Sequence, residues 1–417
     1  MKRDGMKQSF SIGPRRRFLG QLGGVMALGA ALPPAFLARA AAQAKQDRDG
    51  RILVLVELAG GNDGLNTVVP FTNDEYYRQR PTIAQGRGAV HKLNDELGLH
   101  PAMQGFKKLF DDRKLAVVQG VGYPNPNRSH FRSMDIWHTA VPGQVDKRTG
   151  WLGRALDRTA EQHSGRLPAM ALGMERLPLA LVSTKFYVPM VRSLEDYKLQ
   201  LGEGPGREER GTVVEALADQ TAAAGTELEF LRRTAVSAYS SARRLEEVTA
   251  QYQPAAEYPE NGLGQRLKTV AQLIAGDLGV QVFYVSLGGF DTHADQTGAH
   301  NGLMNELSTA LTAFQQDLVG HKLADRVLTC TFSEFGRRVK ENGSLGTDHG
   351  AASQMFLLGN AVKPGIHGVH PSLTRLDQGD LIHHTDFRRV YATLLEKWLD
   401  WPTAQVLAAG HKPMPIL

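Results

Sequence analysis

The sequence predicts an α/β protein with a mostly parallel central sheet flanked by helices, together with a helical insertion. Two observations support this prediction. Apolar, β-branched runs of strand length alternate with helical patterns along the chain, and several of these runs end in glycine-rich or polar loops. The composition, 42% hydrophobic and 22% charged over 417 residues, is typical of a globular protein and excludes disordered, collagen-like and coiled-coil classes.

The first half of the body reads as strand, helix, strand, helix. Arg51 to Leu58 is a continuous apolar run that leads into a glycine-rich loop at 60–64, as buried parallel strands do. A helix over Pro101 to Asp111 and a strand over Leu115 to Gly120 follow. A further helix is expected to start near Phe131 and to run through Trp137.

A helical pattern rich in Ala, Glu, Arg and Leu then predicts an inserted subdomain between Met190 and about Ala255. Because strands are expected on both sides of this block, residues 45–417 should form one domain with an insertion. After the insertion the alternation resumes with a helix over 264–277, a strand over 280–287, a helix over 298–318, a strand over 326–332 and a last helix over 386–399.

The excess positive charge lies at the N-terminus. Residues 1–44 hold seven lysines and arginines against one aspartate, a net charge of +6, so with +5 for the whole chain the remainder is close to neutral. Nucleic-acid binding needs a basic face on the folded body, and this distribution does not provide one. We therefore expect no nucleic-acid partner.

Residues 1–44 have the organisation of an export signal. A basic region precedes the uncharged stretch Phe18 to Leu37, and small residues follow it, which predicts cleavage between Ala40 and Ala44. The string Arg15-Arg16-Arg17-Phe18-Leu19 resembles the twin-arginine consensus, which an exporter of folded proteins reads, with Pro14 in the place usually held by Ser or Thr.

The alternative to cleavage is an uncleaved membrane anchor. Glycines and the adjacent Pro33 and Pro34 interrupt the apolar stretch, whereas a stable membrane span requires about 20 consecutive apolar residues. We therefore expect a periplasmic or secreted protein with the twin-arginine exporter as a partner and with no stable membrane span after cleavage.

Ionisable side chains gather in loops at the ends of the predicted strands. Ligand sites in parallel α/β sheets lie beyond the carboxyl ends of strands. Any one of these side chains alone has an ordinary role, because Asp caps helices and His makes local hydrogen bonds. Together their oxygens and imidazole nitrogens suit divalent zinc, manganese or magnesium. The candidate metal ligands are Asp63, Asp291, His293, Asp348 and His349.

Ser129 is the candidate nucleophile, in a turn-rich loop that follows the strand over 115–120. A serine hydroxyl needs a base or a metal to become reactive. Ser129 also suits the N-cap of the next helix, and both roles can hold together because a helix N-terminus favours a bound oxyanion. His130 could contact a phosphate or sulfate group, or lie on the helix surface. Arg337 or an arginine near Ser129, such as Arg128, could hold anionic oxygens bidentately.

Five motifs, with their order and spacing over roughly Arg51 to Leu399, resemble the bacterial domain-of-unknown-function 1501 family. That family is similar to the alkaline phosphatase and sulfatase superfamily, which implies an alkaline phosphatase-like sandwich with two metals around a Ser, Thr or modified Cys nucleophile. The motifs are Gly-Gly-Asn-Asp-Gly-Leu-Asn-Thr at 60–67, Asn-Arg-Ser-His-Phe at 127–131, Gly-Phe-Asp-Thr-His at 289–293, Ser-Glu-Phe-Gly-Arg at 333–337 and Gly-Thr-Asp-His-Gly at 346–350.

The resemblance implies a role for each candidate residue. It makes Asp63 the ligand after the first strand and Ser129 the nucleophile. Asp291 with His293 would bind one metal, and Asp348 with His349 would be shared between two metals. The chain departs from the superfamily in the spacing of Asp291 and His293, which a single residue separates where three are usual. The last ligand could be any of four later histidines, of which His384 is preferred because Thr385-Asp386-Phe387-Arg388 opens the last helix; the others are His367, His370 and His383.

These expectations combine into two candidate functions. The first is an exported, two-metal hydrolase of phosphate esters, with sulfate esters less favoured because residues 129–132 do not fit the Cys/Ser-x-Pro-x-Arg modification signature of sulfatases. Its partner would be a small anionic ester. The second is a catalytically inactive periplasmic binding or assembly protein on the same fold, with an unknown exported protein as its partner. A dinucleotide-dependent redox enzyme is disfavoured, because the glycines at 60–64 lack the G-x-G-x-x-G spacing.

Overall fold

The computed structural model describes residues 50–142, 148–160, 168–186, 188–191, 252–277, 279–407 and 410–417. The expected export signal lies outside the described residues, and so does most of the expected helical insertion. Its two described ends are not helical, since Met190–Val191 is a short strand and residues 252–260 contain no helix.

A nine-stranded sheet forms the centre of the described part of the chain, with the strand order β11-β5-β10-β9-β1-β8-β6-β7 and β14 paired to β5. The central strand β1 is parallel to both of its neighbours, β8 and β9, whereas β10 is antiparallel to β5 and β9. The expected mostly parallel sheet is therefore confirmed. Its strands are β1 (Ile52–Leu58), β5 (Leu115–Gly122), β6 (Ala169–Leu172), β7 (Met190–Val191), β8 (Val282–Leu287), β9 (Val327–Phe332), β10 (Ser353–Leu358), β11 (Gly365–His367) and β14 (Thr385–Asp386).

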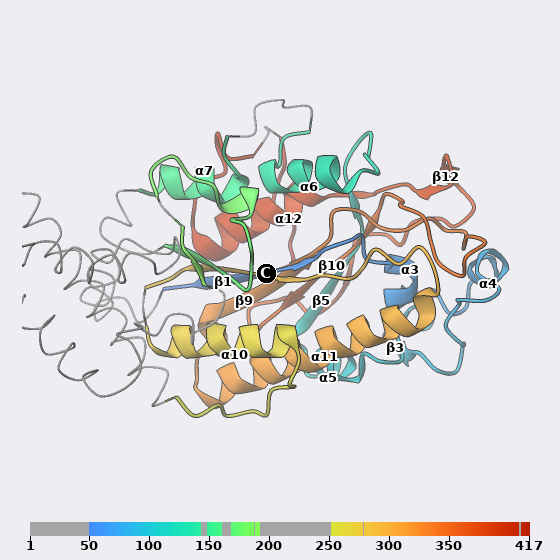
Figure 1. Ribbon diagram of the computed structural model, residues 1–417, viewed down its shortest axis with the longest axis horizontal. Helices are drawn as coiled ribbons and strands as arrows, with labels where there is room; N and C mark the ends of the chain where they lie inside the picture. Colours follow the sequence, from blue (N-terminus) through green and yellow to red (C-terminus); the bar gives the residue numbers. More distant parts are fainter. Residues whose placement is uncertain are drawn as a thin grey trace, which may run out of the picture.

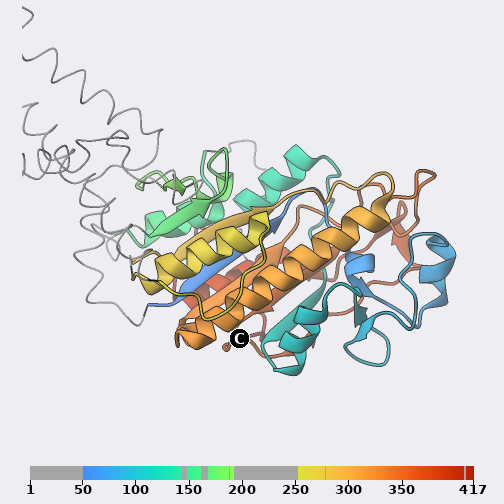
Figure 2. The ribbon, with the colours of Figure 1, turned by 60° about the horizontal axis from the view of Figure 1, so that its bottom comes forward.

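Helices cover both faces of this sheet, as Figures 1 and 2 show. On one face lie α5 (Gln104–Asp111), α10 (Gly262–Ala275) and α11 (Gln296–Gly320). On the other lie α6 (His130–Thr139), α7 (Trp151–Arg158) and α12 (Phe387–Ala392), which continues as a π-helical segment over Thr393–Leu399. None of the described helices has both the length and the apolar character that crossing a membrane requires.

The alternation of side chains along each strand fills two separate cores. In β1, Val54 and Val56 pack with the α5, α10 and α11 layer, whereas Leu53 and Leu55 pack with the α6, α7 and α12 layer. All of these side chains are fully buried, which explains why the strand reads as an uninterrupted apolar run.

Several smaller elements lie outside the main strands and helices, and the sequence did not predict them. The antiparallel hairpin of β12 and β13 and the three-stranded sheet β2-β4-β3 have strands of two residues, too short for a periodic pattern. These elements are α3 (Gly64–Thr67), β2 (Val68–Val69), α4 (Asp74–Gln79), β3 (His91–Lys92), β4 (Gly98–Leu99), η2 (Leu179–Leu181), η3 (Ala324–Arg326), β12 (Leu376–Asp377) and β13 (Asp380–Leu381).

The strand directions bring five loops to one edge of the sheet. β1, β8 and β9 are parallel, so their carboxyl ends meet. β5 runs in the same direction, because β10 is antiparallel to both β5 and β9. For the same reason the amino end of β10 lies at this edge. The loops after β1, β5, β8 and β9 therefore meet the loop before β10, at the edge where ligand sites of α/β sheets lie.

One buried carboxyl lies on β1 beneath this edge. Glu57 is 6% exposed, and its Oε2 accepts a hydrogen bond of 2.7 Å from the Tyr284 hydroxyl, which lies 2.9 Å from His138 Nε2. Burial, reinforced by the charge of Glu334, raises the pKa of Glu57 from 4.5 to about 7, although the bond from Tyr284 acts in the opposite direction.

Replacement of Glu57 by glutamine should therefore change how stability depends on pH. The folded state holds the Glu57 proton up to about pH 7 while the unfolded chain releases it near 4.5, so the wild type loses stability across this window as pH rises. The Glu57→Gln variant lacks this loss and should gain up to about 3 kcal/mol relative to wild type between pH 5 and 8. Urea unfolding at four pH values measures the difference, and parallel curves for the two proteins would contradict the prediction.

Candidate metal centre

Three side chains from separate segments of the chain form a group that could hold a metal ion. His130 is the first residue of α6, Asp291 follows β8, and His349 precedes β10. One ligand atom from each lies within 4.8 Å of the others. Asp291 and His349 were expected as metal ligands, whereas His130 was expected to touch the substrate.

Asp291 is the common contact of this group. Its Oδ1 lies 3.0 Å from His349 Nε2, and its Oδ2 lies 3.4 Å from His130 Nε2. His293, another expected ligand, joins them: its Nε2 lies 3.0 Å from Asp291 Oδ1 and 2.9 Å from His349 Nε2. Three imidazole nitrogens thus converge on one carboxylate.

The other ring nitrogen of each histidine faces a partner that orients the ring. His130 Nδ1 lies 2.8 Å from Glu334 Oε1, and His349 Nδ1 lies 2.7 Å from the carbonyl oxygen of Arg128. His293 Nδ1 is 3.6 Å from Asp348 Oδ1. An Nδ1–H directed at a carboxylate or carbonyl leaves Nε2 with a free lone pair, which is how proteins usually prepare a histidine to bind a metal.

The separations of His130, Asp291 and His349 allow one ion to bind between them, because their ligand atoms all lie within 4.8 Å of one another. Two ligands at about 2.0–2.1 Å from a tetrahedral zinc lie about 3.3 Å apart. His293 lies beside this group, with its Nε2 2.9 Å from His349 Nε2, and the contact of His130 Nε2 with Asp291 Oδ2 is 3.4 Å. His130 Nε2 is also buried without a hydrogen-bond partner in the part of the chain that the structure describes, which a metal would resolve. The side chains of Asp291 and His293 are 48% and 45% exposed, so one side of the group is open to solvent.

Glu334 supports the group, and sequence reasoning gave it no role. This carboxylate is 2% exposed, and besides facing His130 its Oε1 accepts the backbone N–H of Gly60 at 2.8 Å. Glu334 therefore ties the loop after β1 to the first residue of α6. The sequence feature that could have identified Glu334 is its position just after the strand predicted over 326–332.

Arg337 does not have the free donors that substrate binding would need. Its side chain is fully buried and donates to the carbonyl oxygens of Gly61 (2.7 Å), Thr347 (2.9 Å) and Phe290 (2.9 Å), and also to that of Gly60. It further donates to Asp291 Oδ1 at 2.8 Å. The expected contact with anionic oxygens is thus replaced by a positioning role.

The bond from Arg337 also controls the charge of Asp291. Burial acts to raise the pKa of this carboxyl, but the hydrogen bonds from Arg337 and His349 outweigh burial and hold the pKa well below its usual range. Asp291 is therefore an anion at neutral pH, as a metal ligand must be.

Asp63 lies outside the group, although it was expected to bind a metal. It is buried, and Arg80 Nη1 donates to its two oxygens at 2.9 and 2.7 Å. Gln296 Nε2 donates to Oδ2, and Oδ1 also caps α3 by accepting from the Asn66 N–H. Burial acts to raise the pKa of Asp63, but the Arg80 guanidinium outweighs it and lowers the pKa. An arginine thus neutralises this carboxylate where the resemblance implied a metal.

The remaining expected ligands do not complete a second site. His384 is exposed, and its backbone N–H donates to Gly120 O at 2.9 Å while its side chain lies outside the group. Asp348 Oδ1 accepts from Asn342 Nδ2 at 3.2 Å and faces His293 rather than a second cation. Among the residues that the structure describes, one group of side chains is close enough to hold an ion, and the remaining expected ligands are not brought together into a second such group.

Ser129 occupies the N-cap position of α6, as expected, but its hydroxyl makes no capping hydrogen bond. Its backbone N–H donates to Asn127 Oδ1 at 2.9 Å, which fixes the turn before the helix. The residue is exposed and directly precedes His130. The Ser129 hydroxyl is therefore not used for capping.

Arg128, which was expected to contact the substrate, is paired with Asp380 through Nε at 2.7 Å.

The roles of Asp63 and His130 can be separated by mutation. Asp63→Asn leaves the buried Arg80 charge uncompensated, so the free energy of unfolding should fall by about 3–5 kcal/mol while bound metal is retained. His130→Ala should lose metal, and His321→Ala, far along the chain from the group, should keep it. Chemical denaturation at 10 °C measures the free energy of unfolding, and plasma mass spectrometry measures the bound metal. A folded Asp63→Asn protein without metal would restore Asp63 as a ligand.

Comparison with solved structures finds weak, global likenesses to proteins of known class. The chain is similar to a protein in the alkaline phosphatase superfamily from Vibrio parahaemolyticus (9% identity, 76% of this chain, TM-score 0.35), covering 62% of that protein's length. It is also similar to the alkaline phosphatase of the Antarctic bacterium TAB5 (8% identity, 85% of this chain and 99% of that one, TM-score 0.36). A third is the PsFucS1 sulfatase from Pseudoalteromonas sp. (12% identity, 96% and 77%, TM-score 0.38).

Among curated proteins, no sequence matched the chain. A family model did match, and it covers nearly the whole described body. Residues 51–398 fit the family described as "Protein of unknown function (DUF1501)", which confirms the resemblance carried by the five motifs, and the chain belongs to this family.

Proposed function

We propose that the protein is an exported, metal-dependent hydrolase of phosphate esters, with Ser129 as its nucleophile. The observation that carries this proposal is the convergence of three imidazole Nε2 atoms on Asp291, each with its Nδ1 facing an orienting oxygen. His130, Asp291 and His349 would give the ion three protein ligands, and the open face beside Asp291 and His293 would leave the fourth position for water or substrate, as in catalytic zinc sites.

The ion would act as a Lewis acid on the phosphoryl group. The chain supplies the remaining parts. Ser129 lies at the start of the ten-residue helix α6, whose first backbone N–H groups have no partner within the helix and favour an anionic oxygen. These N–H groups would take the place that sequence analysis gave to Arg337, whose donors are already used inside the protein.

The reaction would proceed in two displacements at phosphorus. In the first, a bond forms between Ser129 Oγ and phosphorus while the bond to the alcohol oxygen breaks; the serine proton passes to solvent, and the departing alcohol takes a proton from it. In the second, water attacks the phosphoserine, the Oγ–phosphorus bond breaks, and inorganic phosphate leaves with the hydroxyl restored. Sulfate esters remain the less favoured substrate.

Of the two ions implied by the family resemblance, we propose that one is bound. The Arg80 guanidinium supplies the positive charge beside Asp63 that a second cation would otherwise provide. Export by the twin-arginine exporter, cleavage of residues 1–44 and a periplasmic or secreted location complete the proposal. They rest on the sequence alone.

The incomplete second site favours one alternative, a catalytically inactive binding or assembly protein on the same fold. In that case the single ion would order the loops around Asp291 rather than act on a substrate. Its partner would be another exported protein. The two functions differ in turnover by the metal-loaded chain.

Assays of 4-nitrophenyl phosphate and 4-nitrophenyl sulfate test the proposal. The metal-loaded wild type should hydrolyse the phosphate ester, and Ser129→Ala should reduce kcat at least about 100-fold while keeping its metal. Removal of the metal with a chelator should abolish turnover, and readdition should restore it. Thr309→Ala, on the exposed side of α11, is the matched control for loss of a hydroxyl.

Two outcomes would overturn parts of this proposal. Full activity of Ser129→Ala would show that water attacks phosphorus directly, without a serine intermediate. No turnover of either ester by a protein that binds one equivalent of metal would favour the binding-protein alternative, which co-purification of an exported partner would then test.

A further inference from the structure

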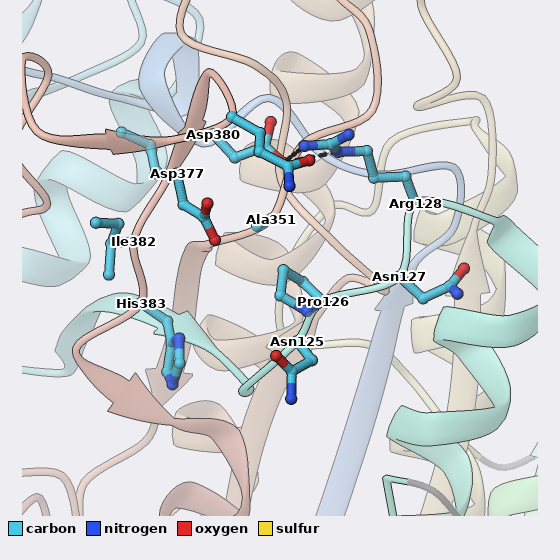
Figure 3. Close-up of a pocket in the computed structure, with 11 residues that line it drawn as sticks. Asn125, Pro126, Asn127, Arg128, Ala351, Asp377, Asp380, Ile382 and His383 are labelled. Carbon is cyan, nitrogen blue, oxygen red and sulfur yellow. Dashed lines mark hydrogen bonds and ion pairs between the residues drawn. The ribbon is translucent and has the colours of Figure 1, made fainter.

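A cavity of about 450 Å³ lies beside the candidate metal centre, and Figure 3 shows its lining. One wall is the loop 125–128, which leads from β5 to α6. The opposite wall is the hairpin of β12 and β13 with the residues that follow it, up to His383. Its volume falls within the range of small-molecule binding sites.

Arg128 connects this cavity to the metal centre. Its carbonyl oxygen lies 2.7 Å from Nδ1 of His349, and its guanidinium on the cavity side pairs with Asp380. Ser129 and His130 follow it directly, and Ala351, another lining residue, lies two positions after His349. The same two segments therefore form the cavity wall and carry the nucleophile and two ligands.

The hairpin presents polar side chains in a fixed arrangement. Asp377 and Asp380 are paired across a two-residue turn, in which Gln378 and Gly379 both have positive φ values of 51° and 89°. That is the turn geometry that matches the twist of a tight hairpin. The two-residue turn thus positions the Asp377 carboxylate and the Gln378 amide at the cavity wall.

The lining matches a neutral, hydroxyl-rich ligand. Side chains of Asn125, Asn127, Gln378 and His383 offer donors and acceptors, and Asp377 adds an acceptor. The second acidic group, Asp380, is neutralised by Arg128 and lies 3.6 Å from Arg338 Nε. Among the described residues that line the cavity there is no Phe, Tyr or Trp, so these residues do not form the aromatic cage that recognises quaternary ammonium groups.

We propose that this cavity binds an alcohol that carries several hydroxyl groups, such as a polyol or a sugar. In the proposed hydrolase, on which this assignment of its role rests, that alcohol is the leaving group of the phosphate ester. The metal and Ser129 would then act on the phosphoryl group while the cavity selects the alcohol.

Saturation-transfer NMR with sorbitol tests binding without turnover. Metal-loaded wild type should transfer saturation to sorbitol, and the Asp377→Ala/Gln378→Ala double variant should reduce the effect at least fivefold. Asp111→Ala, an exposed change on α5, should match wild type. Thermal melting and metal content show whether each variant is folded and loaded. Absence of transfer in the wild type, or transfer to choline but not sorbitol, would overturn the proposal.

Kinetics test the role in selection. The double variant should lower kcat/KM for glycerol 1-phosphate at least tenfold relative to 4-nitrophenyl phosphate, mainly through KM. An unchanged ratio would overturn the role of the cavity in choosing the leaving group. If sorbitol binds as expected but no ester is hydrolysed, the alcohol site stands and the hydrolase assignment fails, so the two proposals are distinguishable.

Discussion

The buried guanidinium of Arg337 holds the candidate centre together. It donates to backbone carbonyls in three loops, those after β1 and β8 and the one before β10, and to the carboxylate of Asp291. Each of these loops enters the edge of the sheet from a different strand, and none has regular structure where it meets the others. A planar group with five donors in a fixed fork suits this task, and lysine could not replace it. Asp291 is thereby fixed as an anion in front of three histidines.

A second buried arginine pairs with Asp63, which was expected to bind a metal. Arg80 reaches Asp63 from α4 and the turn after it, and its remaining donors bind the carbonyls of Arg338 and Val339. A buried carboxylate that accepts two hydrogen bonds from a guanidinium has its charge compensated without a metal. Removing either partner would leave the other charge uncompensated. The site is thus arranged as one open group of ligands beside a closed ion pair. In the proposed hydrolase, the substrate would reach the ion from the exposed face beside Asp291.

The sequence predicted the sheet well because its strands are buried on both faces. β1, β8 and β9 appear as uninterrupted apolar runs, and polar residues mark the ends of each. It also predicted that Asp291, His293 and His349 would meet. It could not predict the Glu334 contact with His130, because 204 positions separate them and only the directions of β5 and β9 bring them together. The ion pair between Asp63 and Arg80 could not be predicted either, because Arg80 lies in a segment without a periodic pattern.

The proposed chemistry requires that His130, Asp291 and His349 together bind one ion. X-ray absorption at the zinc edge, on protein loaded with one equivalent of Zn²⁺, tests this directly. We predict a four-coordinate ion with two imidazole nitrogens, from His130 and His349, and two oxygens, from Asp291 and water, at about 2.0–2.1 Å, with one imidazole fewer in His130→Ala. Coordination by oxygen alone, or a spectrum that His130→Ala and His349→Ala leave unchanged, would contradict it.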